Sequence, residues 1–198
     1  NIGDRERFQK YYAKSSEINT NVASNFYLTL GFKLLISNDI NFARDCFFKQ
    51  LELEKRNNND DGIINTFTNI GLSYFYEDDF KNALKYFESA IDHNGLANLY
   101  HTAETLTFKH LCEKELGMPV DDSFLKQYID KKMETNKEWF KNEPDYLNWA
   151  FYKLFGDDKY ILEAKKPFDR FSHINVKKVS SYPMYRKILE SFKQMQNL

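Results

Sequence analysis

Histidine, cysteine and paired acidic residues are the side chains that most often do chemistry, and here their spacing matches no catalytic pattern. The four histidines lack the helical His–Glu–His spacing of a zinc protease. His101, Glu104 and His110 share one expected helix, but His110 lies two turns beyond Glu104, so we expect no metal site. The pairs Asp78-Asp79 and Asp157-Asp158 suit turns and helix N-termini. With no phosphate loop or nucleophile motif, we expect no catalytic residue, no cofactor and no enzyme activity.

Three asparagines carry the clearest binding chemistry. Asn25, Asn65 and Asn69 are expected inside helices, where asparagine is disfavoured by propensity. A carboxamide has both a donor and an acceptor, as a peptide bond does, so it can hold a peptide backbone. The alternative is that Asn65 and Asn69 bond neighbouring helices or lie near a turn.

The elements that must position these asparagines are paired helices, clearest between Ile64 and Gly95. Small residues, Gly71, Ala83 and Ala90, stand where two helices must touch. Large side chains surround them: Phe67, Ile70, Tyr74, Phe80, Leu84 and Phe87. With Gly71 at the eighth position, the spacing is that of a tetratricopeptide repeat. The alternative is an ordinary helical hairpin.

The same pattern recurs over residues 22–55, with Gly31 at the eighth position. Ser37-Asn38-Asp39 is the expected turn and offers an N-cap to the following helix. Gly31 and Gly71 are about forty residues apart, against a usual period of about thirty-four. The excess falls in the polar stretch 56–62, which we expect to be a loop.

Later segments are predicted to continue the stack. Residues 96–133 indicate a weaker pair whose small contact residue is either Ala103 or Thr107. Residues 144–170 form a degenerate, aromatic-rich hairpin whose second helix should bend or stop at Pro167. Residues 182–195 form a closing helix, which caps the stack or pairs with a second copy of the chain.

A repeat of this kind cannot bury its apolar face alone, so the whole chain is interpreted as one domain, residues 1–198. The predicted fold is all-α: a right-handed α-solenoid of tetratricopeptide-like hairpins. Residues 4–18 are either the second helix of an earlier repeat or a frayed end. Because the sequence begins at Asn1, we expect a fragment of a longer protein.

Composition excludes several partner classes. The net charge of −1 provides no basic field for nucleic acid. No run of eighteen apolar residues and no signal peptide is evident, so no membrane association is expected. Cys46 and Cys112 have no disulfide or metal spacing and are expected to be reduced, which favours a cytoplasmic location.

The first helices of stacked hairpins line the inner wall of the superhelix. Their inward positions give the candidate peptide-binding residues: Asn25, Thr29, Phe32, Asn65, Thr68, Asn69, Leu72 and Tyr76. The expected partner is a short linear peptide or a protein segment.

The stretch SNFYLTLGFKLLISNDINFARDCFFKQLEL, residues 24–53, resembles a repeat of the phage arbitrium receptors. These belong to the wider RRNPP group of peptide-sensing regulators, whose downstream layout is also similar. The resemblance implies a signalling peptide in the concave groove, asparagines on its backbone, and contacts between two copies near the C-terminus. Lys33 and Lys109 are the nearest cationic candidates for a peptide carboxylate. DNA binding would need an N-terminal helix-turn-helix, which is not evident here.

The sequence is compatible with three functions to different degrees. The first is a peptide sensor, in quorum sensing or phage communication, that changes curvature or dimer state on binding. The second is a constitutive scaffold for a protein tail, although a groove that clamps two carboxylates needs more inward Lys or Arg than this chain supplies. The third, an enzyme, lacks a catalytic constellation.

Overall fold

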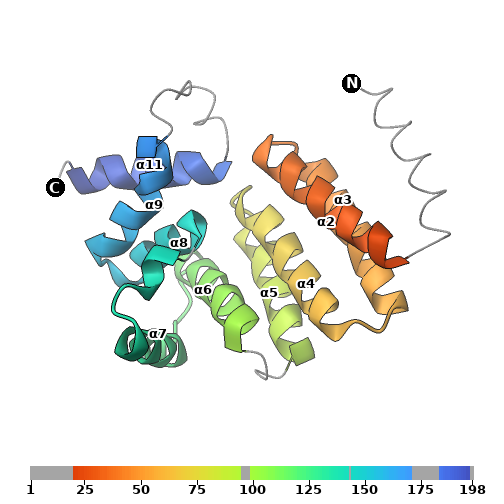
Figure 1. The fold of residues 1–198 in the computed structure, drawn as a ribbon, viewed down its shortest axis with the longest axis horizontal. Coiled ribbons are helices and arrows are strands. Elements are labelled where there is room, and N and C mark those ends of the chain that lie inside the picture. Colours follow the sequence, from red (N-terminus) through yellow and green to blue (C-terminus); the bar gives the residue numbers. More distant parts are fainter. Residues whose placement is uncertain (1–19, 95–98, 143, 171–182, 197–198) are drawn as a thin grey trace.

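The computed structural model describes residues 20–94, 99–142, 144–170 and 183–196. Every regular element in these ranges is a helix, which confirms the all-α class (Figure 1). None of these helices is both long and apolar enough to cross a membrane. The predicted segment 4–18 lies outside the described residues.

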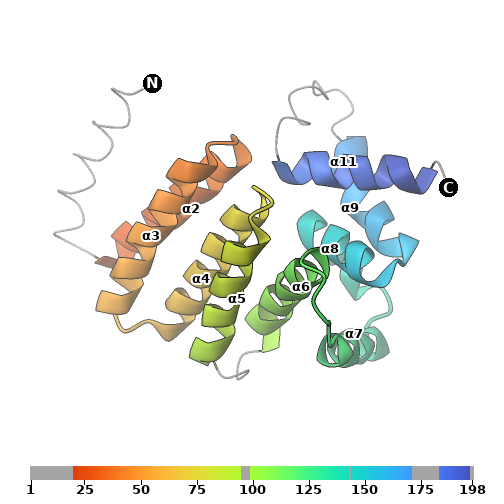
Figure 2. The same ribbon diagram turned by 180° about the vertical axis from the view of Figure 1, so that it is seen from behind.

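Two hairpins form the N-terminal half and lie side by side in both views (Figures 1 and 2). Helices α2 (Thr20–Ile36) and α3 (Ile40–Arg56) make the first, and α4 (Asp60–Phe75) and α5 (Phe80–Asn94) make the second. The helices of each hairpin approach closely at a glycine. An added Cβ on Gly31 would lie 2.4 Å from the Phe47 ring, and one on Gly71 would lie 2.6 Å from the Phe87 ring.

The turns differ from expectation in two details. Asp39 stands at the N-cap of α3 but makes no side-chain capping bond. The polar stretch 56–62 is not all loop, because α4 begins at Asp60. Asn59 caps α4 by accepting a hydrogen bond from the Gly62 amide, 3.2 Å away, and acidic residues in the first turn suit the helix dipole.

The C-terminal half is less regular. Helix α6 (Leu99–Glu115) packs between α5 and α8 (Asp145–Phe155), while α7 (Ser123–Thr135) touches α6 over a smaller area. A 3₁₀ turn, η1 (Trp139–Asn142), leads to the hairpin of α8 and α9 (Asp158–Arg170). Helix α11 (Pro183–Gln196) crosses α8 and α9 (Figure 2).

The structure bears on two expectations for this half. Pro167 does not stop α9, which continues to Arg170. A proline removes only one backbone donor, and the helix ends three residues later, so little of the hydrogen-bond ladder is lost. Ala103 and Thr107 are both buried, and the Thr107 hydroxyl donates to the Ala103 carbonyl at 2.6 Å.

One large core joins the two halves. Its fully buried rings are Phe47, Phe87, Phe108 and Phe151. Phe75, at the end of α4, makes edge-to-face contacts with Phe108 of α6 and Trp149 of α8, at 5.2 and 6.1 Å between ring centroids. The end of α4 is thus fixed against the C-terminal half, and the candidate site lies beside it.

Candidate functional site

A pocket of about 200 Å³ opens where four helices converge. Its lining is almost entirely apolar and comes from α2 (Phe32, Leu35, Ile36), α4 (Leu72, Tyr76), α8 (Asp145, Tyr146) and α11 (Met184, Tyr185). Phe32 is 40% exposed and Ile36 is 52% exposed, so the α2 wall presents apolar surface to solvent. An exposed apolar wall beside a concave site is typical of ligand-binding surfaces.

Helices α2 and α4 present matching stripes toward this region. Residues three or four apart share a helix face, so Asn25, Thr29, Phe32 and Ile36 form one stripe on α2, and Asn65, Asn69, Leu72 and Tyr76 form its counterpart on α4. Each stripe is polar in its first half and apolar in its second. The apolar halves line the pocket, and the polar halves extend away from it.

The predicted site residues divide between these two zones. Phe32, Leu72 and Tyr76 line the pocket together. The other five, Asn25, Thr29, Asn65, Thr68 and Asn69, are not among its lining residues.

Their surroundings decide which of these five can reach a ligand. Asn25 and Thr29 are exposed, and the Thr29 hydroxyl donates to the Asn25 carbonyl at 2.9 Å. Thr68 is buried, and its hydroxyl lies within hydrogen-bonding distance of the Ile64 carbonyl, at 3.1 Å, and of the Thr105 hydroxyl, at 2.8 Å. Thr68 therefore joins α4 to α6 inside the protein.

Asn65 and Asn69 have unused hydrogen-bonding capacity. Asn65 is half-buried and Asn69 is only 8% exposed. Neither carboxamide forms a hydrogen bond with any residue that the structure describes. The polar atoms of the Asn69 carboxamide are not among the buried, unpartnered atoms of the described residues, so solvent reaches them and a ligand could take the place of that water. The alternative, that these asparagines form hydrogen bonds to neighbouring helices, is not supported by the contacts of the described residues.

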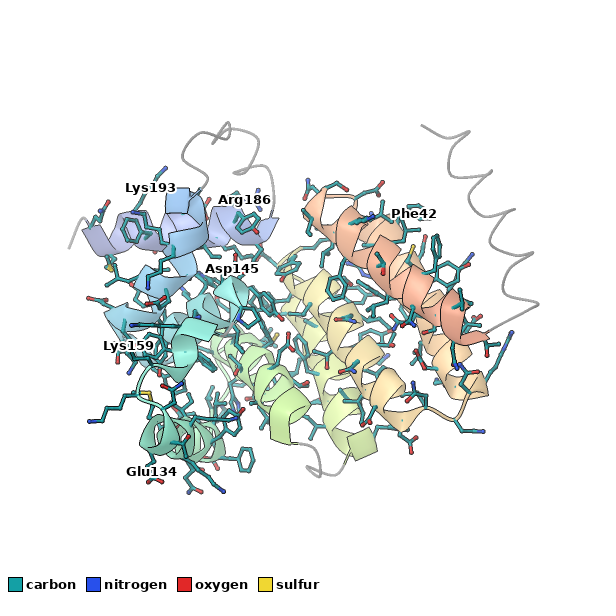
Figure 3. All side chains as sticks on the ribbon, viewed as in Figure 1. Phe42, Glu134, Asp145, Lys159, Arg186 and Lys193 are labelled. Carbon is teal, nitrogen blue, oxygen red and sulfur yellow. The ribbon has the colours of Figure 1, made fainter. Side chains whose placement is uncertain are left out.

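The charge at the pocket is negative. Asp145 is the first residue of α8, beneath α11 (Figure 3). Burial raises the pKa of its carboxyl, and the Tyr146 amide, which donates to it at 3.0 Å, partly opposes that shift. No described cation pairs with Asp145, and none is among the residues that line the pocket.

The tyrosines of the pocket face the same acidic groups. The Tyr146 hydroxyl donates to Glu104 at 2.8 Å. Burial raises the pKa of Tyr76, and the charges of Glu104 and Asp145 raise it further. The Tyr76 hydroxyl therefore stays neutral near pH 7. It is suited to hydrogen bonding and not to acid-base catalysis.

The cationic candidates lie elsewhere. Lys33 is exposed on α2 and is not among the pocket residues. Lys109 pairs with Glu113 on its own helix, α6. A carboxylate-binding role for either lysine at this pocket is therefore not supported by the geometry.

The described residues offer little covalent or metal chemistry. No group of three or more His, Cys, Asp or Glu among them is placed to hold a metal ion. Cys46 and Cys112 are buried, and burial raises the pKa of each thiol to about 12. At neutral pH the reactive thiolate is therefore scarce in both.

Six pocket residues were not predicted: Leu35, Ile36, Asp145, Tyr146, Met184 and Tyr185. Leu35 and Ile36 extend the α2 stripe by one turn, so its periodicity contained a signal for them. Asp145, Met184 and Tyr185 reach the pocket only through the packing of α8 and α11, which no local spacing encodes.

Comparison with protein-family models gives no match for this chain, and comparison with the curated proteins gives none either.

Proposed function

We propose that this chain is a peptide-binding sensor domain: a tetratricopeptide-like, right-handed solenoid that holds a short linear peptide across α2 and α4. The observation that carries the proposal is the nearly buried, unpaired carboxamide of Asn69, one helical turn from an apolar pocket. The resemblance to RRNPP regulators, with their roles in quorum sensing and phage communication, agrees with this proposal.

The two zones of the stripes support a peptide over a smaller ligand. Asn65 and Asn69 offer donors and acceptors along a line, as a repeating backbone requires. The pocket offers space for an apolar side chain of the same ligand, between Phe32, Leu72 and Met184. A peptide satisfies both zones at once, whereas a compact apolar molecule would leave the carboxamides unpaired.

The charge of the pocket indicates a further property of the ligand. Asp145 is partly buried and has no cationic partner among the described residues, so a positive group on the ligand would relieve the cost of its ionisation. The proposed peptide therefore carries an apolar residue near a positive charge.

The experiment selects peptides from a displayed random library and titrates the enriched sequence by calorimetry. Loss of a buried hydrogen bond should reduce affinity by about 1–2 kcal/mol in Asn69→Ala, roughly five- to thirtyfold. Asn65→Ala should also reduce the affinity for the peptide, but by a smaller factor. Gln127→Ala, which removes an exposed carboxamide of α7 that is not among the pocket residues, is the matched control and should bind as the parent does.

Either of two results would contradict this proposal. If Asn69→Ala and Asn65→Ala both keep full affinity while folded, the peptide does not use this groove. If peptide binds but alters neither oligomeric state nor helix protection, the domain is a constitutive scaffold instead of a sensor.

A further inference from the structure

Helix α11 forms one wall of the pocket while belonging to a different part of the fold. Met184 and Tyr185, at its start, line the pocket opposite Phe32 and Leu72. The body of α11 packs chiefly on α8 and α9 instead. The pocket is therefore complete only when the start of α11 lies against the N-terminal hairpins.

The start of α11 is held differently from the rest of the helix. From the middle of α11 onward, Ile188 is fully buried, and the indole nitrogen of Trp149 donates to the Ser191 hydroxyl at 2.9 Å in the interior. In its first half, Arg186 is exposed, at the end of α11 nearer the N-terminal hairpins (Figure 3). Met184 and Tyr185 pack against the edge of the core but are only half-buried, so the start of α11 is less deeply embedded than the part from Ile188 onward.

An ion pair holds the first half in place. The Lys187 ammonium pairs with the Asp78 carboxylate, which lies in the turn between α4 and α5. Asp78 follows Tyr76 by two residues, and Lys187 follows Tyr185 by two residues. The pair therefore joins the two segments whose tyrosines, Tyr76 and Tyr185, both line the pocket.

The surroundings make this pair breakable. The Lys187 side chain is 16% exposed and its ammonium lies 5.7 Å from the centre of the Phe75 ring, while Asp78 is 56% exposed. Both residues line a second pocket of about 190 Å³ with polar residues that include Glu115 and Glu190. Solvent and salt thus reach the pair, so its strength depends on ionic strength.

We propose that the Asp78–Lys187 ion pair is a latch that holds the start of α11 against α4 and so controls whether the ligand pocket is complete. This inference rests on the proposed function for its biological meaning, but the latch itself can be observed without a ligand. A ligand that touches α2, α4 and α11 together stabilises the latched state, and latching strengthens binding by the same factor.

Hydrogen–deuterium exchange of the ligand-free protein tests the latch. In Lys187→Met and in Asp78→Asn, amides at the start of α11, residues 184–190, should exchange about three- to tenfold faster. The double variant should exchange no faster than either single one, because both remove the same contact. Lys193→Met removes a charge from an exposed position of the same helix (Figure 3) and is the matched control. Exchange in Lys187→Met that equals the control would overturn the proposal.

Binding of Nile red, a neutral apolar dye, tests whether the latch controls the pocket. Affinity should fall about three- to tenfold in Lys187→Met, and raised salt should weaken binding to the parent but not to this variant. Ile36→Glu, at an exposed pocket wall, should abolish the signal and so locate the dye. Dye affinity that is unchanged in Lys187→Met, despite faster exchange in α11, would separate the latch from the pocket and overturn the inference. Failure of the proposed function looks different: exchange and dye binding respond as expected, but no peptide binds.

Discussion

The ring of Phe87 occupies the space into which a side chain on Gly71 would project. An added Cβ at Gly71 would lie 2.6 Å from Cε1 and 2.8 Å from Cδ1 of Phe87, closer than side-chain atoms normally approach. Phe87 is fully buried against the core and cannot swing away freely. Gly31 and Phe47 repeat the relationship in the first hairpin.

Substitution of Gly71 should therefore separate α4 from α5. We expect Gly71→Ala to lower the free energy of unfolding by about 1–3 kcal/mol through overpacking, and Gly71→Leu to lower it more. Chemical denaturation measures both. The combination of Gly71→Ala with Phe87→Leu should recover part of the loss, because the smaller side chain leaves room. A Gly71→Leu variant as stable as the parent would contradict this packing.

Arg44 is the cross-link between the two hairpins. It lies over the Tyr74 ring at 3.7 Å, donates to the hydroxyl and carbonyl oxygens of Ser73 at 2.9 and 3.1 Å, and pairs with Glu77. A lysine cannot reproduce this planar, forked geometry. We expect Arg44→Lys to destabilise the fold by about 1–2 kcal/mol, measured by denaturation. Lys49→Arg, on the exposed face of α3, is the control. Equal stability of Arg44→Lys and the parent would show that stacking and the fork contribute nothing.

Asp145 should make stability depend on pH. Its carboxyl has a pKa raised by burial in the folded state, so the folded protein holds this proton more tightly than the unfolded chain does. The associated stability is present below the unfolded pKa and is lost as the pH rises through the folded one. Asp145→Asn should therefore unfold at a higher temperature than the parent at pH 7, and the gap should shrink toward pH 4. A gap that widens on acidification would contradict this sign.

The indole of Trp149 depends on Ser191 for its hydrogen bond, in a buried contact between α8 and α11. Ser191→Ala leaves the indole N–H unsatisfied and should cost about 1–3 kcal/mol of stability. Thermal unfolding monitors this loss. Ser89→Ala removes an exposed hydroxyl that donates to Lys85 within α5, and should be nearly neutral. If the two serine variants melt together, the Trp149 contact does not anchor α11.

Local patterns in the sequence predicted much of the helical framework. Small residues at Gly31 and Gly71 indicate close helix contacts, because only a residue without a side chain admits a facing phenylalanine. Gly117 adopts the left-handed conformation, φ 70°, just after α6, as a glycine that follows a helix commonly does. Such features depend on neighbours within one hairpin, so spacing alone identifies them.

Most of the pocket could not be predicted, because the spacing of residues within one helix does not show which helices pack together. Asp145 lies at the start of the hairpin predicted over residues 144–170, and nothing near it in the sequence indicates that it shares a pocket with Tyr76. Tyr185 was assigned to a closing helix whose partner face was left open. Asp145 and Tyr185 reach the pocket because helices that are distant in sequence pack together. The free energy that positions those helices comes from many contacts throughout the core.

The most direct test of the central claim is native mass spectrometry of the chain, taken straight from its expression host and then mixed with short peptides. We expect a retained or added mass of several hundred daltons on the parent, reduced in Asn69→Ala and kept in Gln127→Ala. The same spectra would show any change between monomer and dimer. A parent chain that binds no peptide under conditions in which it stays folded would contradict the account.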